Sequence, residues 1–184
     1  GEQVIDLEML ASHKGSAFGA LMMAPQPTTE QIQNELFTQL LALDKTRRIW
    51  VEDESIAVGK IFLPEPFWRR MTSSPVIEMN VPKEVRVSRL VNEYGHADRE
   101  EFLKAMAKIE KKMGGQNFKA AKLSLAAGDM PATIELLLTY YDRAYGIGLK
   151  NKRHRIIATA SWDGGNAASF ATQLVSLQPA TVIH

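Results

Sequence analysis

The stretch RIWVEDE, residues 48–54, joins a near-continuous apolar run to three consecutive carboxylates. Three other short segments of the chain are equally rich in valine and isoleucine. Runs of this kind, without strict alternation of apolar and polar residues, are typical of strands covered on both faces, as in a parallel sheet. The sequence therefore predicts four buried strands: VIDL (4–7), RIWVED (48–53), PVIEMNV (75–81) and HRIIATAS (154–161).

Helical patterns lie between these segments. Thr28 and Gln31 have the spacing of a capping box, and the helix that follows carries Ile32, Leu36 and Leu40 on one face. A second helix is expected after Pro82. Strands that alternate with helices predict an α/β fold with a parallel sheet and right-handed crossovers.

Residues 98–145 interrupt this alternation, because they contain no strand pattern. One helix is expected from Asp98 to Gly114, a second over 118–126, and a third from Asp129. The predicted organisation is an α/β sheet domain of residues 1–97 plus 146–184 with an all-helical insertion at 98–145.

Composition excludes several classes of site. The 184 residues suffice for one domain with a helical appendage, and the net charge of +1 gives no strong overall attraction to nucleic acid. The absence of cysteine excludes disulfides, thiolate metal sites and cysteine nucleophiles within this chain. No apolar run approaches the ~20 residues that span a bilayer, so no membrane segment is expected.

Carboxylates follow the first two predicted strands. Asp6 and Glu8 come after the first, and residues 52–54 end the second. Because parallel strands end at the same edge of a sheet, these side chains should converge, and Mg²⁺ held by one or two carboxylates beside a phosphate would neutralise them. The alternative is a solvated loop with ordinary surface acids.

The segment SHKGSAFG, residues 12–19, combines two glycines with polar, basic and aromatic side chains. Its backbone could approach an anion closely, with His13 and Lys14 adding charge. Phe18 could stack on a base or pack an isoprenoid chain; alternatively, it covers the edge of the core. The segment is not a P-loop, since the chain contains no GxxxxGK[ST] pattern.

Arginines supply candidate phosphate contacts. Arg69 lies in PFWRRM, and Arg86 and Arg89 are three residues apart on one helix face. A solvated helix surface is the alternative. The basic cluster KNKRHR, residues 150–155, could contact an RNA backbone or solubilise a loop.

Several longer stretches occur in an order that resembles the C-terminal part of bacterial tRNA 2-selenouridine synthases. The resemblance extends from Val4 to about residue 160. It is carried by VIDLEMLASHKGSAFG, QPTTEQIQNELFTQLLALD, WVEDESIAVGKIFLPEPFWRRM, VPKEVRVSRLVNEYG and LLLTYYDRAY.

The resemblance implies a cytoplasmic bacterial enzyme with a rhodanese-like domain followed by a P-loop-type domain. Such an enzyme alkylates wobble 2-thiouridine of tRNA with geranyl diphosphate. Selenophosphate, supplied by its own synthase, then replaces the S-geranyl group and gives 2-selenouridine. The chain departs from this pattern, because it has neither the rhodanese cysteine nor a phosphate loop. We therefore expect a piece of a longer protein: a P-loop-type domain lacking its first strand and phosphate loop, and inactive alone.

The resemblance also suggests roles for the candidate residues. Asp53, with Glu52 or Asp6, would act at the catalytic centre, and Asp53 and Asp6 would hold Mg²⁺ against the diphosphate of the donor. Two further groups would contact the substrate. The arginines Arg69, Arg86 and Arg89 would stabilise the departing diphosphate. The loop residues His13, Lys14, Ser16 and Phe18 would line the site of the base or the geranyl chain.

Two other functions fit the same residues. The first is a small-molecule kinase-like domain of the P-loop class, which would share the sheet, the arginines and a helical lid. The second is a non-catalytic module that docks tRNA. Phosphoryl transfer to a small molecule would identify the kinase, and binding of tRNA without geranyl diphosphate would identify the docking module.

Overall fold

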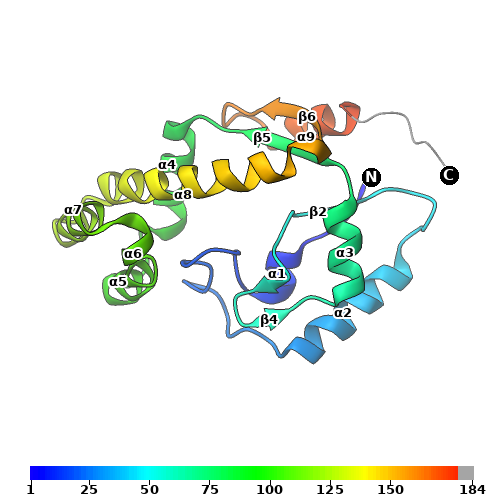
Figure 1. Ribbon diagram of the computed structural model, residues 1–184, viewed down its shortest axis with the longest axis horizontal. Helices are drawn as coiled ribbons and strands as arrows, with labels where there is room; N and C mark the ends of the chain where they lie inside the picture. Colours follow the sequence, from blue (N-terminus) through cyan, green and yellow to red (C-terminus); the bar gives the residue numbers. More distant parts are fainter. Residues whose placement is uncertain (178–184) are drawn as a thin grey trace. The chain divides into compact units, whose positions relative to one another are not determined.

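The computed structural model describes residues 1–177, and the chain divides into two compact units. The first unit comprises Gly1–Ser74 with Ala97–Ile109, and the second comprises Pro75–His96 with the chain from Glu110 onward. Each unit contains its own strands and helices (Figure 1). Within the described residues, no helix has the length and apolar character required to cross a membrane.

The first unit is built on a parallel pair of short strands. β1 and β2 pair in parallel, with Val4 opposite Trp50, and α2 lies in the crossover that connects them. A two-residue turn containing Gly59 then joins the antiparallel strands β3 and β4. The elements are β1 (Gln3–Ile5), α1 (Leu7–Ala11), α2 (Thr29–Ala42), β2 (Ile49–Val51), β3 (Ala57–Val58), β4 (Ile61–Phe62), α3 (Glu65–Ser73) and α5 (Arg99–Ala107).

One apolar cluster holds these elements together. Burial of each large aliphatic side chain contributes about 1.5–3 kcal/mol, so this cluster is the main source of stability in the first unit. Its members come from β1, α1, α2, the hairpin and α3: Ile5, Leu7, Ala11, Ile32, Leu36, Val58, Ile61, Leu63 and Met71.

The second unit is also built on a parallel strand pair. β5 pairs with β6, and Asn80 at the end of β5 lies opposite Ser161 at the end of β6. A smaller core forms where Val87 packs with Ile134 and Leu138. The elements are β5 (Val76–Asn80), α4 (Lys83–Tyr94), α6 (Glu110–Met113), α7 (Gly115–Ala126), α8 (Met130–Lys152), the 3₁₀ helix η1 (Arg153–Arg155), β6 (Ile156–Ser161) and α9 (Ala167–Ser176).

Helix starts follow the predicted caps. Thr28 Oγ1 accepts a hydrogen bond from the Gln31 backbone N–H at 3.2 Å, and Gln31 Oε1 accepts one from the Thr28 N–H at 2.8 Å. Asp98 and Asp129 cap α5 and α8 through their side chains alone, which accept hydrogen bonds from backbone N–H groups of the first helical turn. These side chains satisfy N–H groups that a helix leaves unpaired at its start, so the capping predictions are confirmed.

The four predicted strands are confirmed, although each is shorter than its apolar run or shifted by a residue or two. Within residues 1–177 they form two separate parallel pairs, and the hairpin β3–β4 was not predicted. Its strands have two residues each, too few to show a periodic pattern.

The helical segment 98–145 is shared between the two units. α5 belongs to the first unit, where the Phe102 ring contacts Phe18 with centroids 4.9 Å apart. α6, α7 and α8 belong to the second, where α7 and α8 pack together. The unit boundaries therefore differ from the predicted division into 1–97 plus 146–184 and 98–145, because aromatic packing ties α5 to the loop after α1.

Candidate functional site

The two strand ends of the first unit bring carboxylates together. Ile5 and Val51 are paired at the ends of β1 and β2, so Asp6 and Glu52 leave the sheet at the same edge. Their carboxyl groups lie within hydrogen-bonding reach of each other. The expectation that acids after neighbouring parallel strands converge is therefore confirmed for this pair.

Backbone N–H groups at the start of α1 bind both of these carboxylates. Asp6 Oδ1 accepts a hydrogen bond from Met9 N at 2.7 Å, and Glu52 Oε2 accepts one from Leu7 N at 3.0 Å. Charge-assisted hydrogen bonds of this kind stabilise a helix start. Asp6 and Glu52 therefore have a structural role at this strand end, because they cap α1.

Glu8 completes the carboxylate cluster, which we define as Asp6, Glu8, Glu52 and Glu54. Burial and, to a smaller extent, the charges of Glu54, Glu52 and Asp6 together raise the pKa of Glu8 from 4.5 to about 7. Burial also raises the pKa of Glu52. A proton retained on Glu8 near neutral pH relieves the repulsion among these side chains.

We expect Glu8→Gln to remove a pH dependence of stability. The pKa of Glu8 in the folded chain, about 7, exceeds its ordinary value of 4.5. Ionisation of Glu8 therefore opposes folding, and stability falls as pH rises from about 4.5 to 7. Allowing for solvent screening of this half-buried group, the loss is about 1–2 kcal/mol.

Urea unfolding of the wild type and Glu8→Gln at pH 5 and pH 8 measures this effect. The difference in unfolding free energy between the two pH values should be smaller in the variant, and unchanged in the control Glu35→Gln, whose carboxyl lies exposed on α2. Equal pH dependence in wild type and Glu8→Gln would show that Glu8 ionises normally in the folded chain.

Asp53 follows Glu52 directly and differs from its neighbours in exposure. Its side chain is exposed, whereas those of Glu52 and Glu54 are half-buried. Glu54 N donates to the Glu52 carbonyl at 2.9 Å, so residues 52–54 form a tight turn with Asp53 at its centre. The sequence placed Glu8 and Glu54 among the acids expected to converge, but the catalytic and metal-binding roles were assigned only to Asp53, Glu52 and Asp6.

The carboxylates present a limited set of metal ligands. Within residues 1–177, no group of three or more His, Asp or Glu side chains has an arrangement that could hold a metal ion. Carboxylate oxygens suit Mg²⁺, which uses only one or two protein carboxylates together with water and substrate phosphate. The chain thus fits a two-carboxylate Mg²⁺ site at most, with Asp6 already engaged at one oxygen.

The loop of residues 12–19 lies against the carboxylate cluster. Gly15 has φ +63°, and a Cβ atom there would lie 2.4 Å from Glu54 Oε1, so the glycine makes room for this carboxylate. Within the loop, Lys14 N donates to Gly19 O and Phe18 N donates to Ser16 Oγ. A phosphate held by this loop would lie beside Glu54 and would need a cation between the two charges.

His13 and Phe18 are buried parts of this loop. His13 is 9% exposed, and Cβ atoms added to Gly19 and Gly59 would lie 2.6 and 2.7 Å from its imidazole ring. Burial lowers the pKa of His13, and the charge of Lys108 lowers it further. His13 is therefore a neutral side chain fitted between two glycines, and Phe18, 5% exposed, packs against Phe102.

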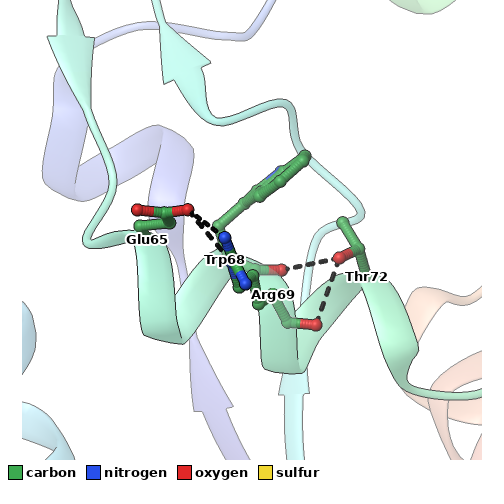
Figure 2. A network of polar contacts seen from close by, with 4 residues as sticks. All are labelled: Glu65, Trp68, Arg69 and Thr72. Carbon is green, nitrogen blue, oxygen red and sulfur yellow. Dashed lines mark hydrogen bonds and ion pairs between the residues drawn. The ribbon is translucent and has the colours of Figure 1, made fainter.

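Arg69 lies on the surface of α3, where it pairs with a carboxylate of the same helix. Its Nε and Nη2 donate to Glu65 Oε1 at 3.0 and 2.6 Å (Figure 2). Nearby, Thr72 Oγ1 donates to the Trp68 carbonyl at 3.0 Å. Both side chains of the ion pair are mostly exposed, so it contributes little to stability.

Arg86 and Arg89 belong to the second unit, whereas the carboxylate cluster belongs to the first. The Arg86 guanidinium pairs with Asp142 through two nitrogens, and its Nε donates to the Val81 carbonyl at 3.1 Å. The hydrogen bond to Asp142 raises the pKa of Arg86. Arg89 lies 5.0 Å from the centroid of the Trp162 ring. The two arginines thus differ in role, despite their shared helix.

The second unit contains a cleft that sequence reasoning missed. It lies where β5 and β6 end, and the sequence WDGGN, residues 162–166, forms part of its wall. A polar, glycine-containing segment directly after a parallel strand was the signal that could have predicted it, because ligands bind beyond the carboxyl ends of such strands.

Comparisons with known proteins identify the family. Residues 1–173 match the family model described as the tRNA 2-selenouridine synthase AAA domain. Curated relatives named tRNA 2-selenouridine synthase include those of Shewanella piezotolerans, 30% identical over 83% of this chain and 50% of the relative, and Shewanella woodyi, 30% identical over 86% and 51%. The protein of Shewanella oneidensis is 28% identical over 85% of this chain and 50% of its own length.

The chain therefore spans about half the length of the curated relatives it matches. No solved structure shows a significant match. The mixed helices and small parallel sheets agree with a P-loop-like AAA domain. Because the family model covers almost the whole chain, the chain belongs to the tRNA 2-selenouridine synthase AAA domain family.

Proposed function

We propose that the chain is part of a bacterial cytoplasmic enzyme that converts wobble 2-thiouridine of tRNA to 2-selenouridine. The observation that carries this proposal is the family match over residues 1–173. The thiouridine sulfur attacks C1 of geranyl diphosphate, the C1–O bond breaks, and diphosphate leaves with the electron pair. The selenium of selenophosphate then attacks C2 of the uracil ring, the C2–S bond breaks and geranylthiolate leaves, and water hydrolyses the P–Se bond to release phosphate.

The fold supports a P-loop-type domain whose first strand and phosphate loop come from outside residues 1–184. The parallel pairs β1–β2 and β5–β6 are separate within the described residues.

The strand-end carboxylates would serve the geranyl-transfer step. Negative charge builds on the diphosphate as the C–O bond breaks, and bound Mg²⁺ would neutralise it. Asp53 is exposed and directly follows Glu52 of the carboxylate cluster, and it would hold the ion with Asp6 or Glu52. Half-buried Lys14 of the neighbouring loop would contact the substrate, whereas His13 is buried between Gly19 and Gly59.

The C-terminal half of α8 and the segment after it support tRNA binding by the second unit. Residues 143–162 contain no Asp or Glu, and Tyr145 on this stretch is 63% exposed. Phosphate contacts give RNA affinity, and exposed aromatic rings can stack on unpaired bases. The cations of this stretch are Arg143, Lys150, Lys152, Arg153 and Arg155.

Asp53→Asn in the whole enzyme tests the metal site. The substitution removes one charge at constant size, so geranylation of thiouridine-containing tRNA should slow by at least about tenfold. Single-turnover assays with geranyl diphosphate measure the rate, and circular dichroism verifies folding. Glu35→Gln removes an exposed carboxylate of α2 and should leave the rate unchanged. Geranylation by Asp53→Asn at the wild-type rate would exclude Asp53 from the metal site.

A further inference from the structure

The cleft of the second unit has the dimensions of a small-molecule site. Its volume is about 520 Å³, within the range of ligand pockets. It opens at the ends of β5 and β6, beside the first turn of α9. Its lining comes from these three elements and the loops that join them: Asn80, Pro82, Ser161, Trp162, Asp163, Gly165, Asn166, Ser169, Phe170 and Gln173.

The lining favours an uncharged, planar ligand. It contains no Lys or Arg, and Asp163 is its one ionisable side chain, so a diphosphate would meet a like charge and no cation. Trp162 and Phe170 provide aromatic surface. Asn80 and Gln173 carry side-chain amides, which offer both donors and acceptors to the edge of a heterocycle.

Trp162 is held in place and carries an unsatisfied donor. Its backbone N–H donates to the Asn80 carbonyl at 2.9 Å, which extends the pairing of β5 and β6. Arg89 lies 5.0 Å from the ring centroid, and the Phe170 ring lies 6.0 Å away at 31°. The indole N–H is buried and has no hydrogen-bond partner within residues 1–177.

We infer that this cleft binds a nucleobase. A base has a planar face for contact with Trp162 and Phe170 and edges that pair with amides, while Asp163 can accept hydrogen bonds from ribose hydroxyls. On the basis of the proposed function, we take this nucleobase to be an unpaired base of tRNA. Trp162 is the last residue of the stretch 143–162, which contains no Asp or Glu. The cations that would contact the RNA backbone and the tryptophan of the cleft therefore belong to one continuous segment.

The tryptophan indole N–H signals of the whole protein provide the test. With ¹⁵N-labelled tryptophan, the Trp162→Phe variant identifies the Trp162 peak. An anticodon stem-loop with an unpaired loop should shift this peak, and a fully paired duplex of the same stem should leave it unmoved. Uridine 5′-monophosphate tests the free nucleotide as the source of the base.

Two neighbours on α9 give matched variants that avoid disturbing Trp162 itself. Gln173 lines the cleft and Thr172 does not. Gln173→Ala should weaken stem-loop binding by about fivefold or more through the lost hydrogen bonds, and Thr172→Ala should bind within about twofold of the wild type. Equal affinity of all three proteins would overturn the assignment.

The other outcomes separate this inference from the proposed function. Stem-loop binding that leaves the Trp162 peak unmoved would overturn the cleft assignment and leave the modification activity standing. A shift with uridine monophosphate alone would support the nucleobase and overturn RNA as its source. A shift with nucleotide in a protein that does not modify tRNA would support the cleft and overturn the proposed function.

Discussion

Phe18→Ala is expected to lower the free energy of unfolding by about 3–5 kcal/mol, because it removes a large buried ring and leaves a cavity. Phe18 is 5% exposed and its ring lies 4.9 Å from that of Phe102, which is 1% exposed. The substitution would therefore detach α5 from the loop of residues 12–19. Urea unfolding followed by circular dichroism measures the loss.

Two further variants separate packing by Phe18 from contact with substrate. Phe37 lies on α2 and is 61% exposed, so Phe37→Ala should change stability by no more than about 0.5 kcal/mol. Phe18→Leu retains most of the buried volume and should cost less than Phe18→Ala. If Phe18→Ala unfolded at the wild-type denaturant concentration while geranylation by the whole enzyme failed, Phe18 would be a substrate contact and not a core residue.

Gly59→Ala is the second substitution with a large expected effect, about 2–5 kcal/mol of lost stability. Gly59 has φ +64°, a conformation that costs an L-residue about 1–2 kcal/mol. An added Cβ would also lie 2.3 Å from Gln26 Oε1 and 2.7 Å from the His13 ring. Gln26 cannot move freely, since its Nε2 donates to Ala11 O and Val58 O. Overpacking therefore adds to the backbone strain.

Gly114→Ala isolates the backbone contribution. Gly114 has φ +86°, and a Cβ there would meet nothing within 4 Å. Because its ψ is 141°, Gly114 lies outside the left-handed helical region in a conformation that is almost exclusive to glycine, so Gly114→Ala should cost about 1–3 kcal/mol through the backbone alone. The excess cost of Gly59→Ala over Gly114→Ala in the same unfolding assay measures the contact with His13 and Gln26. Equal costs would show that the loop relaxes around the added methyl group.

Local signals in the sequence predicted the elements well. Apolar runs identified the four strands of the two parallel pairs, and Thr28, Asp98 and Asp129 identified helix starts through chemistry that involves only neighbouring residues. The helix expected from Asp98 to Gly114 is instead divided into α5 and α6. Two of its buried residues, Ile109 and Met113, belong to different units, which no periodicity within the segment reveals.

The candidate site was predictable only where it follows from topology. Parallel strands end at one edge, and this brought Asp6 and Glu52 together. Which of three consecutive acids turns inward depends on the register of β2, so the burial of Glu52 and exposure of Asp53 could not be read from spacing. The ion pair of Arg86 could not be read from spacing either, because its partner Asp142 lies 56 residues away in the sequence.

The short parallel pairs also affect how the chain behaves at high concentration. Within residues 1–177 each pair contains only two strands, so backbone N–H and C=O groups remain open along its outer edges. Such edges are templates for intermolecular β-pairing and aggregation. Val4 on β1 and Met79 on β5 are 62% and 51% exposed, which adds apolar contact to that tendency. Low protein concentration, low temperature and partners that pair with these edges should therefore reduce aggregation of the chain.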